Sequence, residues 1–196
     1  MPIDETNSKF IIPEKNYNLW RYMDFPSFLS LITSSTLTFV RADLFEDKFE
    51  GTLPKTTALS IDENMDNLLQ MDNLQSEPFS LSKVVSDVMN KKIFMNCWCK
   101  EDSELIHMWK IYSKENGIAI ATNYETLKTS LDSLEKIYPT EIRYVNFKNI
   151  NILKPNTFTP YTLKQEAYKS ENELRLLIFD NKNTDKEVIS CKVTFN

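Results

Sequence analysis

The sequence predicts an α+β fold in which helices flank a central, mostly antiparallel sheet that is mixed or split. The chain has 196 residues, of which 41% are hydrophobic, and this is enough to bury one substantial core. Strand-like and helix-like segments alternate irregularly, unlike the regular alternation of a doubly wound sheet, and two strand-like segments come last. We therefore expect residues 1–196 to form a single domain.

The first part of the chain predicts a strand, a short helix and a second strand. The apolar segments over residues 19–23 and 36–40 have the length and composition of strands. Between them, Asp24 can cap a helix, Pro26 suits its first turn, and the apolar residues fall on one face, so a helix is expected over 24–35.

A polar and acidic loop, which turns at Gly51, is expected to follow the second strand. The composition then shifts toward Asp, Asn, Gln, Leu and Met. Two helices, near 61–72 and 78–90, fit this segment best. Residues 60–92 are therefore predicted to be a helical insertion or a lid over a site.

The second half of the chain is more strongly patterned. Strands are expected over 92–98, 118–122, 141–147, 173–180 and 187–195, and helices over 101–117, 123–134 and 159–170. The last helix is predicted because Thr159 can cap it and Pro160 suits its first position. The polar turn "NKNTD" between the last two strands predicts that they form a hairpin.

Composition excludes several functional classes. The chain has only two glycines, Gly51 and Gly117, and therefore has neither GxGxxG nor a phosphate-binding P-loop. A formal net charge of -5 and a pI near 5.1 argue against general affinity for nucleic acid, although a local basic groove stays possible. No apolar run is long enough to span a membrane and the amino terminus does not resemble a signal peptide, so we expect a cytoplasmic protein that does not bind membranes.

Three cysteines are present, an odd number, and they are expected to be reduced. Cys97 and Cys99 fall on one face of a strand, and a metal site with Cys191 and the single histidine, His107, is conceivable. We do not expect such a site, because structural zinc sites usually contain CxxC-like spacings.

The most informative stretch is "YKSENELRLLIFD", residues 168–180, in which an apolar strand begins at two glutamates. Residues two apart in an extended chain point to the same side, so Glu171 and Glu173 are expected to face one site together. A purely structural interpretation is also open, because Arg175 is close enough to form an ion pair with one of them.

Several blocks follow one another in the order of a known family. The chain resembles a large bacterial and phage family of uncharacterised proteins in its "LWRYM", "RADLFEDKFEG", "NCWCKEDSELIHMWKIYSKENGIAIAT" and "YKSENELRLLIF" segments, which span residues 19–179. Members of that family are often linked to phage defence or to toxin-like loci. This resemblance implies a role in conflict between phage and host.

The layout of the predicted elements also resembles the ADP-ribosyltransferase fold, in particular toxins that modify nucleic acid. That likeness implies NAD as a co-substrate, with Arg21 on the first strand, Cys99 at the position of a middle serine or threonine, and Glu173 as the late glutamate of an E-x-E pair. A thiol at position 99 departs from the pattern, because it is a poor substitute for a hydroxyl hydrogen bond.

The chemistry of NAD suggests a role for each candidate. Cleaving nicotinamide from NAD passes through an oxocarbenium-like ribose, which an anion stabilises, and this is the role expected for Glu173. Glu171 would accept a proton from the nucleophile. Arg21 would bind the pyrophosphate. Aromatic side chains would stack on nicotinamide or adenine, and the candidates are Tyr22, Trp109 and Tyr112.

Two other classes of function stay open. The carboxylates Asp43, Glu46, Asp47 and Glu50 lie in one loop and could hold magnesium in a nuclease. Alternatively, the loop is structural, with Phe45 and Phe49 packed in the core. The chain could also be a non-catalytic module that binds a nucleotide or a protein, as an immunity or anti-defence factor does, and Cys99 at the middle position favours this alternative. The acceptor of a transferase could be nucleic acid or protein.

Overall fold

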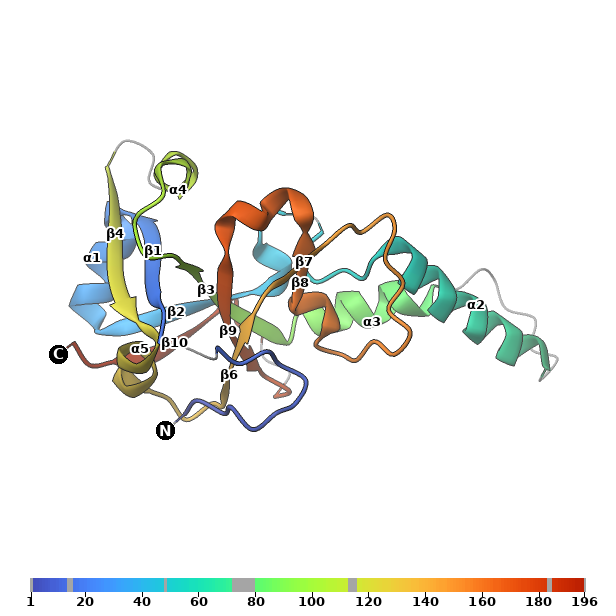
Figure 1. Ribbon diagram of the computed structural model, residues 1–196. Coiled ribbons are helices and arrows are strands. Elements are labelled where there is room, and N and C mark those ends of the chain that lie inside the picture. Colours follow the sequence, from blue (N-terminus) through green and yellow to red (C-terminus); the bar gives the residue numbers. More distant parts are fainter. Residues whose placement is uncertain are drawn as a thin grey trace.

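The computed structural model describes residues 2–13, 16–47, 49–71, 80–112, 116–182 and 185–195. Within these ranges the fold is α+β, with antiparallel strands that curl into a half-barrel and helices around them (Figure 1). The sheet consists of β1 (Asn18–Asp24), β2 (Thr36–Arg41), β3 (Ile93–Lys100), β4 (Gly117–Asn123), β5 (Leu131–Asp132), β6 (Ile137–Glu141), β9 (Glu173–Phe179) and β10 (Val188–Val193). The predicted class and the largely antiparallel sheet are thus confirmed.

Strand β3 lies at the centre of the sheet. One edge of β3 pairs along its length with β9, from Ile93 opposite Phe179 to Cys99 opposite Glu173. The opposite edge is shared between two strands. The shared edge pairs with β1 only near Cys99 and with β2 only near Met95. The sheet is therefore split between β1 and β2, with β3 at the apex of the split.

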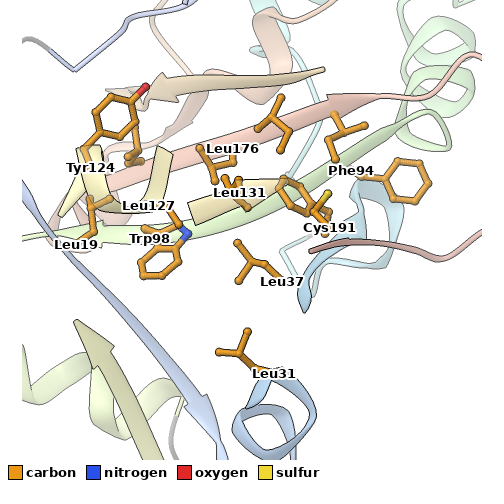
Figure 2. Packing of buried hydrophobic residues seen from close by; sticks show 14 of the residues in the cluster. Leu19, Leu31, Leu37, Phe94, Trp98, Tyr124, Leu127, Leu131, Leu176 and Cys191 are labelled. Atoms are coloured by element: carbon orange, nitrogen blue, oxygen red, sulfur yellow. The ribbon is translucent and has the colours of Figure 1, made fainter. Parts of the chain in front are cut away.

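One face of the sheet carries the main hydrophobic core, which α1 (Phe25–Ser34) and α5 (Tyr124–Ser130) cover. Figure 2 shows residues of this core: Leu127 of α5 lies near Trp98 of the sheet, and Leu31 of α1 lies at the margin of the group, beyond Leu37 of β2. Side chains alternate between faces along a strand. The opposite face of β3 and β9 therefore presents a different set of residues.

Helix α1 begins as the sequence predicts. The Asp24 carboxylate accepts a hydrogen bond from the Ser27 backbone N–H at 2.9 Å, and Pro26 stands in the first turn, where its missing N–H costs nothing. Ser35, in the left-handed conformation, ends the helix and leads directly into β2. The predicted strand, helix and strand over residues 19–40 are confirmed.

Two further helices, α2 (Lys55–Met71) and α3 (Leu81–Asn90), form a pair that extends away from the sheet (Figure 1). They are joined at Asp62 of α2, which accepts hydrogen bonds from the Ser80 hydroxyl and from the backbone N–H of Ser82. Both helices were predicted, and residues 72–79 between them lie outside the described residues. A role as a lid stays a prediction.

Two predictions about the carboxyl-terminal part are wrong. Residues 159–170 do not form one α-helix: they form the 3-10 helix η2 (Thr159–Tyr161), the short strand β8 (Leu163–Gln165) and most of a second 3-10 helix, η3 (Glu166–Glu171). The last two strands do not form a hairpin, because β10 pairs with β2 and β5 whereas β9 pairs with β3 and β6. Strand β8 pairs with β7 (Arg143–Val145) in a small parallel sheet.

The remaining elements are the 3-10 helix η1 (Ala42–Leu44) and the short helix α4 (Ile106–Tyr112). Helix α4 packs against β1, and η1 contacts β3 and α3. None of the helices in the described ranges combines the length and the apolar character that crossing a membrane requires.

Candidate functional site

A cavity of about 810 Å³ lies on the face of the sheet opposite the main core. Its floor is formed by β1, β3 and β9, and its walls are formed by the loop after β2, by α4 and by η3. The exposed residues among its lining, which mark the mouth, include Leu44, Ile111, Tyr112 and Tyr168. A volume of this size is typical of pockets that bind small molecules, which run from roughly 300 to 1,000 Å³.

The structure brings almost all of the candidate residues to this one cavity. The candidates that line it are Arg21, Tyr22, Cys99, Tyr112, Glu171 and Glu173. Trp109 does not line it: its ring packs edge-on against Tyr22, with the centroids 5.3 Å apart, and its Nε1 donates to Glu104 at 2.8 Å. Trp109 thus supports the wall that Tyr22 forms.

The two glutamates face the cavity, but not through the extended geometry that their spacing suggests. Glu171 ends η3, Glu173 begins β9, and Asn172 between them is left-handed, with a φ of 39°. Asparagine tolerates this conformation better than most residues. The side-chain amide of Asn172 donates a hydrogen bond to the Glu101 carboxylate at 3.0 Å. The backbone carbonyl of Asn172 accepts a hydrogen bond from the backbone N–H of Lys100. The turn is therefore fixed to the end of β3.

Arg175 is fully buried beneath the cavity and holds two carboxylates at once. Its Nε donates to Oε1 of Glu173 at 2.7 Å and its Nη2 to Oε2 of Glu173 at 3.1 Å. Its Nη1 and Nη2 also donate to the two carboxylate oxygens of Glu50. A further bond from Nη1 reaches the Tyr161 carbonyl at 3.1 Å. The expected ion pair between Arg175 and a glutamate is thus present, and it extends to a second carboxylate.

Lys164 connects the two candidate glutamates, and the sequence analysis did not identify it. Its Nζ lies 2.6 Å from Oε2 of Glu171 and 3.3 Å from Oε2 of Glu173. Strand β8 places Lys164 opposite Tyr144 of β7, and the Tyr144 hydroxyl accepts from the backbone N–H of Glu173 at 2.8 Å. The small β7–β8 sheet therefore positions both the lysine and the start of β9.

This environment displaces the pKa values of the two glutamates in opposite directions. Burial raises the pKa of Glu171, and the attraction of Lys164 only partly offsets this effect. Burial would also raise the pKa of Glu173, but the charges of Arg175 and Lys164 outweigh it and hold this pKa well below its usual range. Glu173 is therefore firmly ionised, whereas Glu171 takes up a proton more readily.

Arg21 lies in the split of the sheet. Its Nη1 donates to the Cys97 carbonyl at 2.7 Å, at a position where the edge of β3 pairs with neither β1 nor β2. Among the described residues, no carboxylate forms an ion pair with Arg21, although its side chain is partly buried and lines the cavity. A cation in this position favours an anionic ligand.

The two cysteines on the floor of the cavity are held as neutral thiols. Burial raises the pKa of Cys97 well above its usual value, and the Glu173 carboxylate adds to this effect. Burial, with a smaller effect from Glu101, raises the pKa of Cys99 to about 12. Because the thiolate is the form that attacks electrophiles and binds metals, neither residue is suited to those roles at neutral pH.

The aromatic candidates differ in how accessible they are. Tyr22 is buried, and its hydroxyl accepts a hydrogen bond from the Leu105 backbone N–H at 2.8 Å, which anchors the segment before α4. Tyr112 is 44% exposed at the mouth of the cavity, and partial burial raises its pKa. Tyr168 also lines the cavity, and the Lys164 ammonium lies 5.0 Å from the centre of its ring. Tyr112 and Tyr168 are the exposed rings of the described lining, and a ligand can reach both.

Three of the four carboxylates of the acidic loop have partners within the protein. Glu50 is held by Arg175, Asp43 pairs with Arg41 at 2.7 Å, and Asp47 accepts from the Phe49 backbone N–H at 2.9 Å. Within the described ranges, no three His, Cys, Asp or Glu residues are grouped so that they could hold a metal ion. The expected anchoring of the loop in the core is correct for Phe45, which packs on a buried cluster, and wrong for Phe49, which is 55% exposed.

The buried ion pairs beneath the cavity form a charge network of Glu50, Lys164, Glu171, Glu173 and Arg175. The sequence analysis did not predict the role of Glu50 or of Lys164 in it. Glu50 was visible only as one of four loop carboxylates, and 125 positions separate it from Arg175. Lys164 fell in a segment that was predicted to be helical.

Comparisons of the chain with protein-family models, with curated proteins and with solved structures gave no match.

Proposed function

We propose that the cavity binds NAD or a closely related nucleotide and breaks the bond between nicotinamide and ribose, as ADP-ribosyltransferases do. The observation that carries this proposal is the pair of glutamates on one wall of the cavity, with pKa values displaced in opposite directions. Such a pair provides one carboxylate that stays charged and one that exchanges protons, which is the usual arrangement for acid–base chemistry at a glycosidic carbon.

Arg21 would bind the pyrophosphate of the nucleotide. Its guanidinium lines the cavity and, in the described part of the chain, has a backbone carbonyl but no carboxylate as partner. Arginine matches the geometry of phosphate oxygens with paired donors. The exposed rings of Tyr112 and Tyr168 at the mouth would stack on a flat base.

Glu171 would act as the base. As the bond from ribose C1′ to the nicotinamide nitrogen breaks, its electron pair leaves with the neutral ring and a positive charge develops on the ribose. An oxygen nucleophile then bonds to C1′, and Glu171 takes its proton. The raised pKa of Glu171 suits it to this transfer near neutral pH. The products are nicotinamide and an ADP-ribosyl group on water or on an acceptor.

Glu173 would act mainly by its charge and by positioning its neighbours. A carboxylate has about four acceptor sites, and those of Glu173 receive Arg175 twice, Lys164 and the Cys97 thiol. Little capacity is left for a direct bond to a ribose hydroxyl. Glu171 accepts from Lys164 through one oxygen and is therefore better placed to contact a ligand.

The acceptor sites of Glu173 are already occupied by protein groups, and this favours a second candidate, a module that binds a nucleotide without cleaving it. Arg175 and Lys164 partly neutralise Glu173, which weakens its attraction for a positive ribose. Cys99, with a neutral thiol, stands where the resemblance implies a hydroxyl. Binding without release of nicotinamide is the property that would identify such a module, whether in phage defence or in an anti-defence role.

The deciding experiment measures nicotinamide release from NAD by the wild-type protein and by Glu171→Gln, Glu173→Gln and Glu63→Gln variants. Glu63 is exposed on α2, far from the lining of the cavity, and provides a matched control. We expect Glu171→Gln to lower the rate roughly 10²- to 10⁴-fold, the contribution typical of a general base, and Glu63→Gln to leave it unchanged.

Circular dichroism and thermal unfolding would confirm that each variant is folded. Host lysate and NAD labelled in the adenylate phosphate would show whether the ADP-ribosyl group passes to an acceptor. Binding of NAD without release, in a folded protein, would favour the binding module. Failure to bind NAD would contradict both candidates.

A further inference from the structure

Among the residues that the structure describes, the lining of the cavity contains more carboxylates than basic groups. Its lining includes two basic side chains, from Arg21 and Lys164. It also includes five carboxylate side chains, from Glu46, Asp47, Glu50, Glu171 and Glu173. Arg175, beneath the floor, adds a third cation. The ligand that fits this cavity must therefore match an uneven distribution of charge.

Two of the three cations are already engaged by the protein. Arg175 holds Glu50 and Glu173, and Lys164 holds Glu171 and Glu173, all with side chains that are at most 10% exposed. Three carboxylates thus share two cations, and this network retains an excess negative charge. A second anionic group of a ligand would have to break one of these buried pairs, which is costly.

Among the cations of the described lining, Arg21 is the one that remains for a ligand. In the described part of the chain it pairs with no carboxylate, and the donor shown in a hydrogen bond is Nη1, to the Cys97 carbonyl. In the same lining, Glu46 is exposed and Asp47 is partly exposed on the loop after β2. The floor at Arg21 therefore attracts an anion, and the walls formed by this loop and by η3 attract a cation.

We infer that the cavity selects, among nicotinamide nucleotides, the form that combines one pyrophosphate with a positively charged ring, and that it discriminates against the reduced form and the 2′-phosphorylated form. The inference rests on the proposed function in that it takes the ligand to be such a nucleotide. The reduced form lacks the ring charge that the excess carboxylates favour. The 2′-phosphorylated form brings a further anion, for which the described residues of the lining offer no unengaged cation.

The test is isothermal titration of the wild-type protein with NAD⁺, NADH and NADP⁺, with nicotinamide release followed in parallel. We expect NAD⁺ to bind at least about tenfold more tightly than either of the others, since charge pairs in a partly buried site are worth about this much or more. Equal binding of NADH or NADP⁺ would overturn the inference and leave the proposed reaction standing. Selective binding of NAD⁺ without release would support the inference and contradict the reaction.

A charge substitution at the mouth provides a second test. Glu46→Lys adds a cation at an exposed position of the lining, and Glu63→Lys makes the same change in charge on α2. We expect Glu46→Lys to raise the affinity for NADP⁺ relative to NAD⁺ by at least about fivefold, and Glu63→Lys to leave this ratio unchanged. If the ratio of the affinities for NADP⁺ and NAD⁺ stays unchanged in both variants, the inference is contradicted. It is also contradicted if none of the three nucleotides binds.

Discussion

Arg175 connects the largest number of features in the candidate site. Its guanidinium is fully buried, and it joins β9, the loop after β2 and the carbonyl of Tyr161. A buried ion pair adds little to stability compared with apolar residues of the same volume, but removal of one partner leaves an uncompensated charge in the interior. Arg175 is therefore a residue whose loss affects the whole network.

Replacement of Arg175 by methionine is expected to lower the free energy of unfolding by about 3–5 kcal/mol, because Glu50 and Glu173 then lose their shared cation. Urea unfolding followed by circular dichroism would measure this change. Arg143→Met is the matched control, since Arg143 is exposed and should tolerate the change within about 0.5 kcal/mol. Equal stabilities of the two variants would show that Glu50 and Glu173 are not left as uncompensated buried charges when Arg175 is lost.

At this scale, part of the site could be predicted from the sequence. The glutamate pair and Arg175 are close together in the chain, so their proximity follows from local geometry. The pairing of Arg175 with Glu50 depends on contacts between distant strands, which no local pattern encodes. Lys164 escaped notice because Thr159 as a cap and Pro160 at the first position predicted a helix, and a strand of three residues, Leu163–Gln165, carries too little pattern to outweigh them.

Among the elements, the loop after β2 depends on one glycine. Gly51 has a φ of 69°, and a Cβ built there would lie 2.1 Å from Oδ1 of Asn90. Asn90 ends α3 and its Oδ1 accepts from the Tyr161 hydroxyl at 2.7 Å. The Ser86 hydroxyl of α3 donates to the Gly51 carbonyl at 2.7 Å. The close approach at Gly51 thus fixes Glu50 and the acidic wall against α3.

Substitution of Gly51 by alanine is expected to destabilise the protein by roughly 1–3 kcal/mol, the usual cost of a left-handed non-glycine residue in a site without room to adjust. Thermal and urea unfolding would measure it. Gly117→Ala is the control, because Gly117 does not have a positive φ. A comparable loss in both variants would contradict the role assigned to the positive φ and the close contact at Gly51, since alanine at a compatible position reduces the entropy of the unfolded chain and does not destabilise.

The elements themselves were predicted better than their connections. Strands β1, β2, β3, β4 and β9 and helix α1 fall where apolar periodicity and capping residues place them. Helix α5 begins as expected but ends at Ser130, because the next two residues form β5 and pair with β10. The expected hairpin at the end of the chain failed because adjacency in sequence favours pairing without determining it. Strand β10 instead completes the free edge of β2, and its Cys191 joins the main core.

For the molecule as a whole, the buried charges couple stability to pH. The pKa of Glu173 falls from an ordinary value of 4.5 to about 2 in the folded protein, since Arg175 and Lys164 outweigh the effect of burial. A lowered pKa means that the unfolded chain binds the proton first, so Glu173 stabilises the fold above pH 4.5 and this contribution is lost toward pH 2. The contribution of Glu171 to the pH dependence of stability has the opposite sign, because burial raises its pKa and the folded protein then binds the proton more readily than the unfolded chain.

The free energy of unfolding is therefore expected to fall steeply between pH 4.5 and pH 2, and to fall less steeply in a Glu173→Gln variant that is already destabilised at pH 7. Urea titrations at a series of pH values would measure both curves. The exposed Glu63→Gln substitution should leave the wild-type curve unchanged. Parallel curves for wild type and Glu173→Gln would contradict the assigned shift.

The pairing of β2 with β10 also determines when the sheet can close during synthesis on the ribosome. Val40 lies opposite Val188, so one partner is made long before the other. At about 5–20 residues per second, roughly 7–30 s pass between the two. During this interval the edge of β2 that β10 later covers has no partner strand, and unpaired edges recruit other chains. A nascent chain of this protein therefore depends on protection of that edge until β10 emerges.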